Sequence, residues 1–157
     1  MGDRVNASII IGGALPHHLL EDFLDTIEAE GVGPDWDDIF EDRKALEAHI
    51  RRGDAGVAFY ADRVLNGEFD ALQAFCAQYG LAYKLSYDGY TGSWSPATRI
   101  LGLDGLETSC SLDGDEGPPC VSLEDIQALR LADLDAVKAY LLCFQDYQSP
   151  PLVIGPA

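Results

Sequence analysis

The chain has 157 residues, the length of one ordinary domain, and a hydrophobic fraction of 47%, typical of globular proteins. Ten Lys and Arg residues stand against 27 Asp and Glu residues, which gives a formal net charge of −17. This charge repels DNA, RNA and anionic lipid, because binding to a phosphate backbone depends on cationic side chains. We therefore expect neither direct nucleic-acid binding nor a membrane partner.

The first apolar run, residues 7–11, is too short to span a bilayer or to serve as a signal peptide. We therefore expect a cytoplasmic protein, and the reducing poise of the cytoplasm argues against a disulfide among its four widely separated cysteines, which contain no C-x-x-C pair. Cys110 and Cys120 flank a turn-rich segment and are the pair that a disulfide would join.

The N-terminal third predicts a strand, a turn and helices. Residues 8–11 are apolar and largely β-branched, which predicts a short buried strand that Gly12-Gly13 ends as a turn. A helix follows from Pro16 and ends at Gly31, since its apolar residues recur at helical spacing. In the next acidic passage, Asp37 or Asp38 is the expected N-cap of a helix, or of two short helical pieces, that ends before Gly53.

The middle of the chain predicts strands around one helix. Residues 56–60 indicate a second strand, and residues 68–79 a helix that Gly80 ends. Residues 81–87 alternate apolar and polar side chains, as a half-buried strand does. A turn at Asp88-Gly89 and further strand character over residues 90–94 and 98–103 predict a hairpin or meander.

Residues 104–119 are rich in Gly and Pro and predict a loop. Ser122 and Asp125 form a capping-box pattern that begins a short helix, and Asp133 caps a last helix that extends to about Tyr147. Residues 152–154 indicate an edge strand or a docked tail.

These elements give the order β-α-(α)-β-α-β-β-α-α. The order predicts an α+β fold in which one domain, residues 1–157, holds a mixed or antiparallel sheet with helices mainly on one face. A ferredoxin-like core is one arrangement that fits this order.

The acidic residues are the main functional signal. Eleven carboxylates lie between Glu21 and Glu47, offset by Arg43 and Lys44 alone. Displayed along two helices, they would attract a basic protein surface and could imitate the phosphates of a duplex. The expected partner-binding residues are Glu21, Asp22, Asp25, Glu28, Asp35, Asp37, Asp38, Glu41 and Asp42.

No pattern for catalysis, cofactor or metal binding is complete. A calcium loop starting at Asp35 would need Gly and Glu where Phe40 and Leu46 stand. Adjacent residues on a helix point about 100° apart, so His17 and His18 do not share a metal easily. Gly12-Gly13 lacks the spacing of a phosphate-binding loop, and no G-x-S-x-G occurs. We therefore expect no cofactor, no metal and no catalytic residue.

The leading hypothesis is a non-enzymatic acidic module that binds a basic protein, in its sharpest form a DNA-mimic inhibitor of antirestriction or anti-CRISPR type encoded on a mobile genetic element. One alternative is a small enzyme or ligand-binding domain with its site near Gly12-Gly13 and the aromatic hairpin. Another is a structural or immunity-type protein that pairs through its sheet edge. A secondary binding face on the hairpin would consist of Tyr83, Tyr87, Tyr90 and Trp94.

Overall fold

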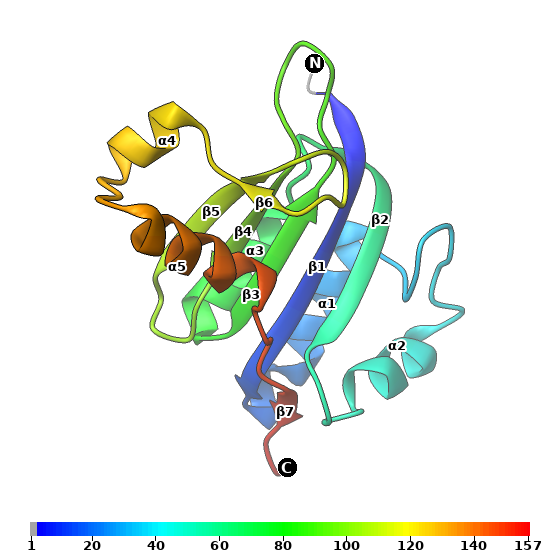
Figure 1. Cartoon of the computed structure of the whole chain (residues 1–157). Helices are drawn as coiled ribbons and strands as arrows, with labels where there is room; N and C mark the ends of the chain where they lie inside the picture. Colours follow the sequence, from blue (N-terminus) through cyan, green and yellow to red (C-terminus); the bar gives the residue numbers. More distant parts are fainter. Residues whose placement is uncertain (1–2) are drawn as a thin grey trace.

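A computed structural model describes residues 3–157, which form one seven-stranded sheet with helices on both of its faces (Figure 1). The strands are β1 (Arg4–Leu15), β2 (Val57–Leu65), β3 (Ala82–Tyr87), β4 (Ala97–Leu101), β5 (Glu107–Leu112), β6 (Pro119–Cys120) and β7 (Leu152–Ile154). The helices are the short 3-10 helix η1 (His17–Leu19) and the α-helices α1 (Leu20–Glu30), α2 (Arg43–Ile50), α3 (Asp70–Tyr79), α4 (Leu123–Ala128) and α5 (Leu134–Gln145). The α+β class predicted from the sequence is confirmed.

The sheet has the order β2-β1-β3-β4-β5-β6, and each neighbouring pair is antiparallel. The short strand β7 pairs in parallel with the last residues of β1. Because β2 and β3 are both antiparallel to β1, they run parallel to each other with β1 between them, and α3 connects them. This split β-α-β unit belongs to ferredoxin-like folds too, but the remaining strands here follow as a meander, so a ferredoxin-like core is not formed.

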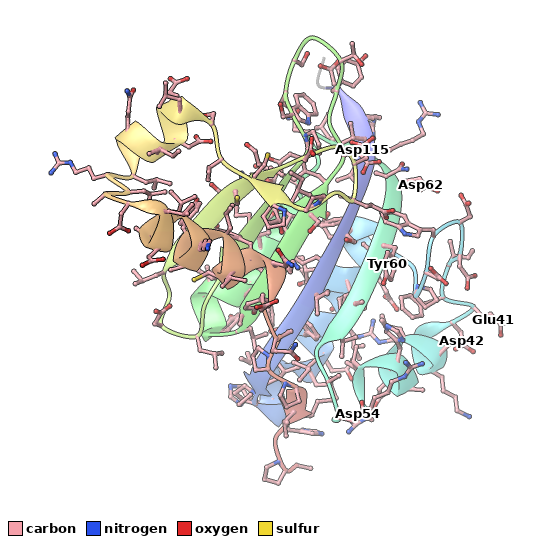
Figure 2. The ribbon with its side chains drawn as sticks, in the orientation of Figure 1. Glu41, Asp42, Asp54, Tyr60, Asp62 and Asp115 are labelled. Atoms are coloured by element: carbon pink, nitrogen blue, oxygen red, sulfur yellow. The ribbon has the colours of Figure 1, made fainter. Side chains whose placement is uncertain are left out.

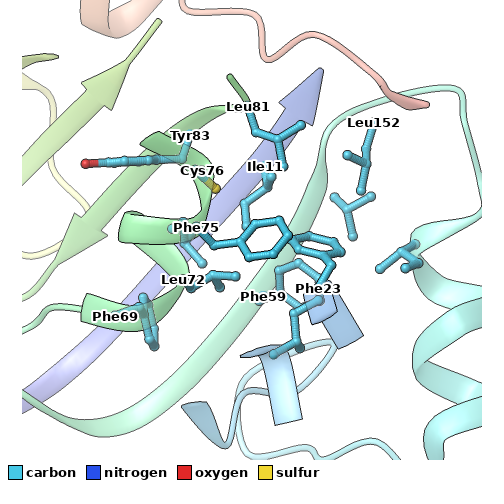
Figure 3. Close-up of a cluster of buried hydrophobic side chains, with 14 of the residues drawn as sticks. Ile11, Phe23, Phe59, Phe69, Leu72, Phe75, Cys76, Leu81, Tyr83 and Leu152 are labelled. Carbon is cyan, nitrogen blue, oxygen red and sulfur yellow. The ribbon is translucent and has the colours of Figure 1, made fainter. Parts of the chain in front are cut away.

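The main core lies between the sheet and the helices α1 and α3. Along β1 the side chains of Ala7, Ile9 and Ile11 point to this core, since alternate residues of a strand share a face. The rings of Phe23 from α1 and Phe75 from α3 meet there with their centroids 5.3 Å apart (Figure 3). Burying a large apolar side chain contributes about 1.5–3 kcal/mol. Because a slip of one residue would turn these side chains of β1 to the other face, their burial fixes the register of the strand.

The helix α5 lies across the other face of the sheet, over the outer strands (Figure 1). There Phe144 packs with Ile100 of β4 and Cys110 of β5 in a second, smaller cluster. This layer is thinner, because Phe144 is the one fully buried residue of α5 and α4 buries none. Helices therefore cover both faces of the sheet, with α1 and α3 on one and α5 on the other, and not mainly one face as predicted.

Gly12 and Gly13 are not a turn: β1 continues through both of them to Leu15. A Cβ at Gly12 would lie 1.8 Å from the carbonyl oxygen of Pro150, so the residue must be glycine for the C-terminal segment to cross β1. The Gly13 amide donates a hydrogen bond of 3.0 Å to Pro151 O. The glycines therefore serve a close approach between backbones.

Two further expectations differ from the structure. The helix α2 starts later than expected, because its N-cap is Asp42, whose carboxylate accepts a 2.7 Å hydrogen bond from the Ala45 amide. The expected loop 104–119 contains β5, which extends the meander beside β4. The capping box at Ser122 and the cap at Asp133 are confirmed.

Candidate protein-binding surface

The nine predicted partner-binding carboxylates are all exposed, and they come from two consecutive segments. Four lie on α1, and five lie between Asp35 and Asp42, in the connection that leads to α2. We call these two segments, with the N-terminus of α2, the acidic surface. Figure 2 shows Glu41 and Asp42 beside α2, beyond the outer edge of β2.

Arg43 joins the two segments of the acidic surface. Glu21, Asp25 and Glu28 follow each other at helical spacing and so share one face of α1. The Arg43 guanidinium contacts their carboxylates at 2.8, 2.8 and 2.9 Å. The hydrogen bonds to Asp25 and Glu21 raise the pKa of the guanidinium above its ordinary value. One positive charge thus meets three negative charges, and the group keeps an excess of two carboxylates.

Several carboxylates of the connection between α1 and α2 shape its backbone. Asp35 accepts a 2.8 Å hydrogen bond from the Trp36 amide, and Asp38 accepts one of 2.9 Å from the Ile39 amide. Such bonds from Asp to nearby amides are typical of turns. Together with the cap at Asp42, they fix the path of the connection without cancelling its charge.

The connection is also attached to the edge strand β2. Gly33 and Tyr60 exchange backbone hydrogen bonds of 2.8 and 3.0 Å, and the rings of Trp36 and Tyr60 pack with centroids 4.9 Å apart. Asp37, in the left-handed region at φ 59°, faces Asp62 of β2. A hydrogen bond with the Asp37 carboxyl group raises the pKa of the exposed Asp62, and desolvation and charge repulsion from Asp37 add to the shift.

An apolar cavity of about 250 Å³ opens within the acidic surface, between α1 and α2. Glu28, Asp42 and Arg43 contribute charged groups to its lining. Ile39, at the cavity, is 75% exposed, a large exposed area for an isoleucine. Its apolar wall consists of Ile27, Val32, Ile39, Phe40 and Leu46.

The sequence did not predict this cavity, because Ile39 and Phe40 were assigned to a helix that actually begins at Arg43. The signal that points to it is an apolar pair, Ile39 and Phe40, between acidic residues in a segment without helical spacing.

The four aromatic residues of the predicted secondary face do not form one surface. Tyr83 is 2% exposed and belongs to the main core, where its hydroxyl donates a hydrogen bond to Glu107 at 2.5 Å. Tyr87 is partly buried and packs against that core. Tyr90 and Trp94 pack together in the loop between β3 and β4, with their ring centroids 5.6 Å apart. The proposed face is therefore reduced to this loop pair.

The alternative site at Gly12-Gly13 is filled by the segment around Pro150. His17 and His18 are exposed in η1, whereas His49 lies with its Nε2 2.9 Å from Ala58 O. Within residues 3–157, no three His, Cys, Asp or Glu side chains are placed to hold a metal ion.

The four cysteines are free thiols. Cys110 donates a hydrogen bond to the backbone oxygen of Cys120 at 3.2 Å. Burial raises the pKa of the Cys76 thiol to about 12. These thiols therefore form no disulfide in the structure.

Comparisons with protein-family models, with curated proteins and with solved structures found no significant match. None of the helices within residues 3–157 has both the length and the hydrophobicity that crossing a membrane requires.

Proposed function

We propose that this chain is a non-enzymatic binding module whose acidic surface engages a basic surface on a partner protein. The observation that carries the proposal is the apolar cavity at Ile39, surrounded by exposed carboxylates. Protein interfaces concentrate their binding energy in a desolvated apolar pocket, while charges around it steer association. The acidic surface combines the two features.

The geometry also indicates the kind of residue that would enter the cavity. A volume of about 250 Å³ accommodates one aliphatic or aromatic side chain rather than a helix. Exposed carboxylates on α1 and in the connection to α2 would meet Lys or Arg residues on either side of it. The expected binding motif is therefore a basic segment with one large apolar residue.

The proposal in its sharpest form makes the partner a nucleic-acid-binding protein, whose DNA site the acidic surface would occupy. The net charge of −17 supports this form. Arg43 reduces the negative charge of the acidic surface, because three of the carboxylates on α1 pair with its guanidinium. The carboxylates left without a cation are mainly those of the connection, such as Glu41.

A short lysine-rich peptide with one central leucine is a suitable probe. We compare it, by fluorescence anisotropy over a range of salt concentrations, with the same peptide carrying alanine in place of leucine. Burial of leucine should make its peptide bind about tenfold more tightly or better. Binding of both peptides should weaken as salt rises. The Ile39→Ser variant should lose the preference for leucine.

Arg43→Gln and Lys44→Gln provide a matched pair, since each removes one positive charge at neighbouring positions. Arg43→Gln frees three carboxylates and should strengthen peptide binding more than Lys44→Gln does, because Lys44 makes no ion pair within residues 3–157. Equal effects of the two changes, or equal binding of the two peptides, would refute the assigned surface.

The DNA-mimic form needs a separate assay. Restriction endonucleases and CRISPR effectors bound to labelled duplex DNA are titrated with the chain, and release of the duplex is measured. We expect release from at least one of them, and loss of release when Glu41 and Asp42 are replaced by lysine. If no complex releases its duplex while the leucine peptide still binds, the partner belongs to another class of basic protein.

A further inference from the structure

A second cavity lies on the opposite face of the sheet, beneath α5. It measures about 400 Å³, is open to solvent, and is lined by the sheet, by α5 and by the turn between β5 and β6. Figure 1 shows α5 and this turn on the same side of the sheet, away from α1 and α3. Its floor is polar because Ser8, Ser86 and Thr98 stand opposite one another on β1, β3 and β4. Lys84 of β3 lines it beside this row.

Lys84 has no counter-ion. Within residues 3–157 no carboxylate lies within ion-pair distance of its ammonium, whereas Arg43, Arg51 and Arg99 each have at least one partner. The Lys84 Nζ lies over the ring of Tyr147, 6.0 Å from its centroid. Partial burial of Lys84 lowers the pKa of its amine. A half-buried cation without a carboxylate is unexpected in a chain with 27 acidic residues.

The cavity contains, besides Lys84, other side chains whose hydrogen-bond donors are not used. Thr98 donates its hydroxyl to Leu85 O at 3.1 Å and therefore accepts from Ser86 at 3.0 Å, so both of these hydroxyl protons are used. Half-buried Ser8 and solvent-exposed Gln145 also line the cavity, and neither side chain has a hydrogen-bond partner within residues 3–157. Three donors with no acceptor, namely Lys84, Ser8 and Gln145, therefore share one cavity.

The other lining residues decide what kind of acceptor fits. Leu112, Pro119 and Phe144 form an apolar wall, and Glu116 brings a negative charge to the lining. The net charge of −17 opposes any ligand with several negative charges. A single carboxylate that carries a short apolar body satisfies the donors and the wall, and it meets less repulsion from Glu116 and the net charge than a ligand with several negative charges.

We propose that the cavity beneath α5 binds a small organic carboxylate with no further negative charge. The carboxylate pairs with the Lys84 ammonium and accepts hydrogen bonds from Ser8 and Gln145, while the apolar part of the ligand packs against Phe144. Charge-assisted hydrogen bonds of this kind are about twice as strong as neutral ones. The site lies on another face than the acidic surface and does not depend on the function proposed for it.

Three six-carbon probes test the proposal in NMR titrations of the full chain: hexanoate, hexanol and adipate. Hexanoate should shift the resonances of Ser8 and Lys84 saturably, with a Kd on the order of 1 mM. Hexanol lacks the charge and adipate carries a second one, so each should bind at least about tenfold more weakly. Equal binding of hexanol would overturn the proposal, because the cavity would then recognise only apolar surface.

Lys84→Met keeps an unbranched apolar side chain out to Cε and removes the ammonium, and Lys138→Met makes the same change at an exposed position on α5. Hexanoate affinity should fall at least about tenfold in the first variant and stay unchanged in the second. Lys84→Gln repeats the test with a polar side chain in case methionine alters the fold. Unchanged hexanoate binding in a folded Lys84 variant would refute the site.

Discussion

The crossing of the C-terminal segment over β1 is open to a sharp test through Gly12→Ala. A Cβ at this position would lie 1.8 Å from Pro150 O and 2.8 Å from the carbonyl carbon of that residue. Neither contact is tolerable, and both atoms belong to backbone. Since Gly12 does not have a positive φ, alanine fits the conformation of β1 itself. The segment from Ser149 must therefore move away.

The cost of that movement follows from what the segment contributes. Leu152 is 1% exposed, and its burial stabilises the fold by about 1.5–3 kcal/mol. Backbone hydrogen bonds at Gly13, Leu152 and Gly155 anchor the segment, and each contributes about 0.5–1.5 kcal/mol. The freed residues recover conformational entropy, and alanine itself favours the strand. We expect Gly12→Ala to lower the free energy of unfolding by about 2–4 kcal/mol.

Urea unfolding followed by circular dichroism measures this loss. The control is the same substitution in a chain that ends at Gln148, where no carbonyl remains for the new methyl group to meet. There Gly12→Ala should be neutral or stabilise by up to about 1 kcal/mol. A loss of equal size in both backgrounds would show that the glycine is needed for the strand itself, and our explanation would be wrong.

Three other predictions follow from titratable groups. The raised pKa of Asp62 means that its pairing with Asp37 stabilises the fold at low pH, and that this contribution is lost as pH rises from 3.8 through the raised value. Asp62→Asn should therefore increase the free energy of unfolding at neutral pH, as measured by urea unfolding at several pH values. The control Asp54→Asn should leave the free energy of unfolding unchanged. Iodoacetamide and mass spectrometry should find exposed Cys143 alkylated in the folded chain and Cys76, with its pKa of about 12, protected until unfolding. NMR titration of Lys84 should give a midpoint below the ordinary 10.5, and a midpoint at or above it would mean that a carboxylate approaches the amine in solution.

The C-terminal ends of α1 and α3 and the starts of α4 and α5 were predictable because their signals are local, whereas the start of α2 at Asp42 was not predicted. Gly31 and Gly80 adopt left-handed conformations at the ends of α1 and α3, and Ser122 and Asp133 accept hydrogen bonds from the first turns of their helices. Each of these interactions spans only a few residues, so the residue types reveal them.

The strands were harder to predict wherever distant segments decide the structure. Gly12 is glycine because Pro150 crosses it, and nothing near Gly12 in the sequence records that crossing. The strand β5 has exposed polar residues and only Cys110 fully buried, so its sequence lacks the alternation that indicates a strand. Pairing with β4 determines its conformation, and that pairing is a long-range contact.

The sequence predicts that the carboxylates of the acidic surface are exposed, but it does not predict which of them form ion pairs with Arg43. Helical spacing places Glu21, Asp25 and Glu28 on one face, as expected from the sequence. That Arg43 reaches all three depends on how α2 follows its connection, which the Asp42 cap decides. The cavity at Ile39 depends on the same connection, so its position requires the folded structure.

Internal pairing does not remove the excess of negative charge. The three arginines in ion pairs, Arg43, Arg51 and Arg99, contact six carboxylates between them, which leaves most of the 27 acidic side chains without a cation. Ile39 is 75% exposed, and it differs from other exposed apolar residues such as Leu106 and Leu123 in lining an apolar cavity with carboxylates at its rim. The proposed partner, a basic surface with one apolar side chain, would cover both the cavity and the carboxylates around it.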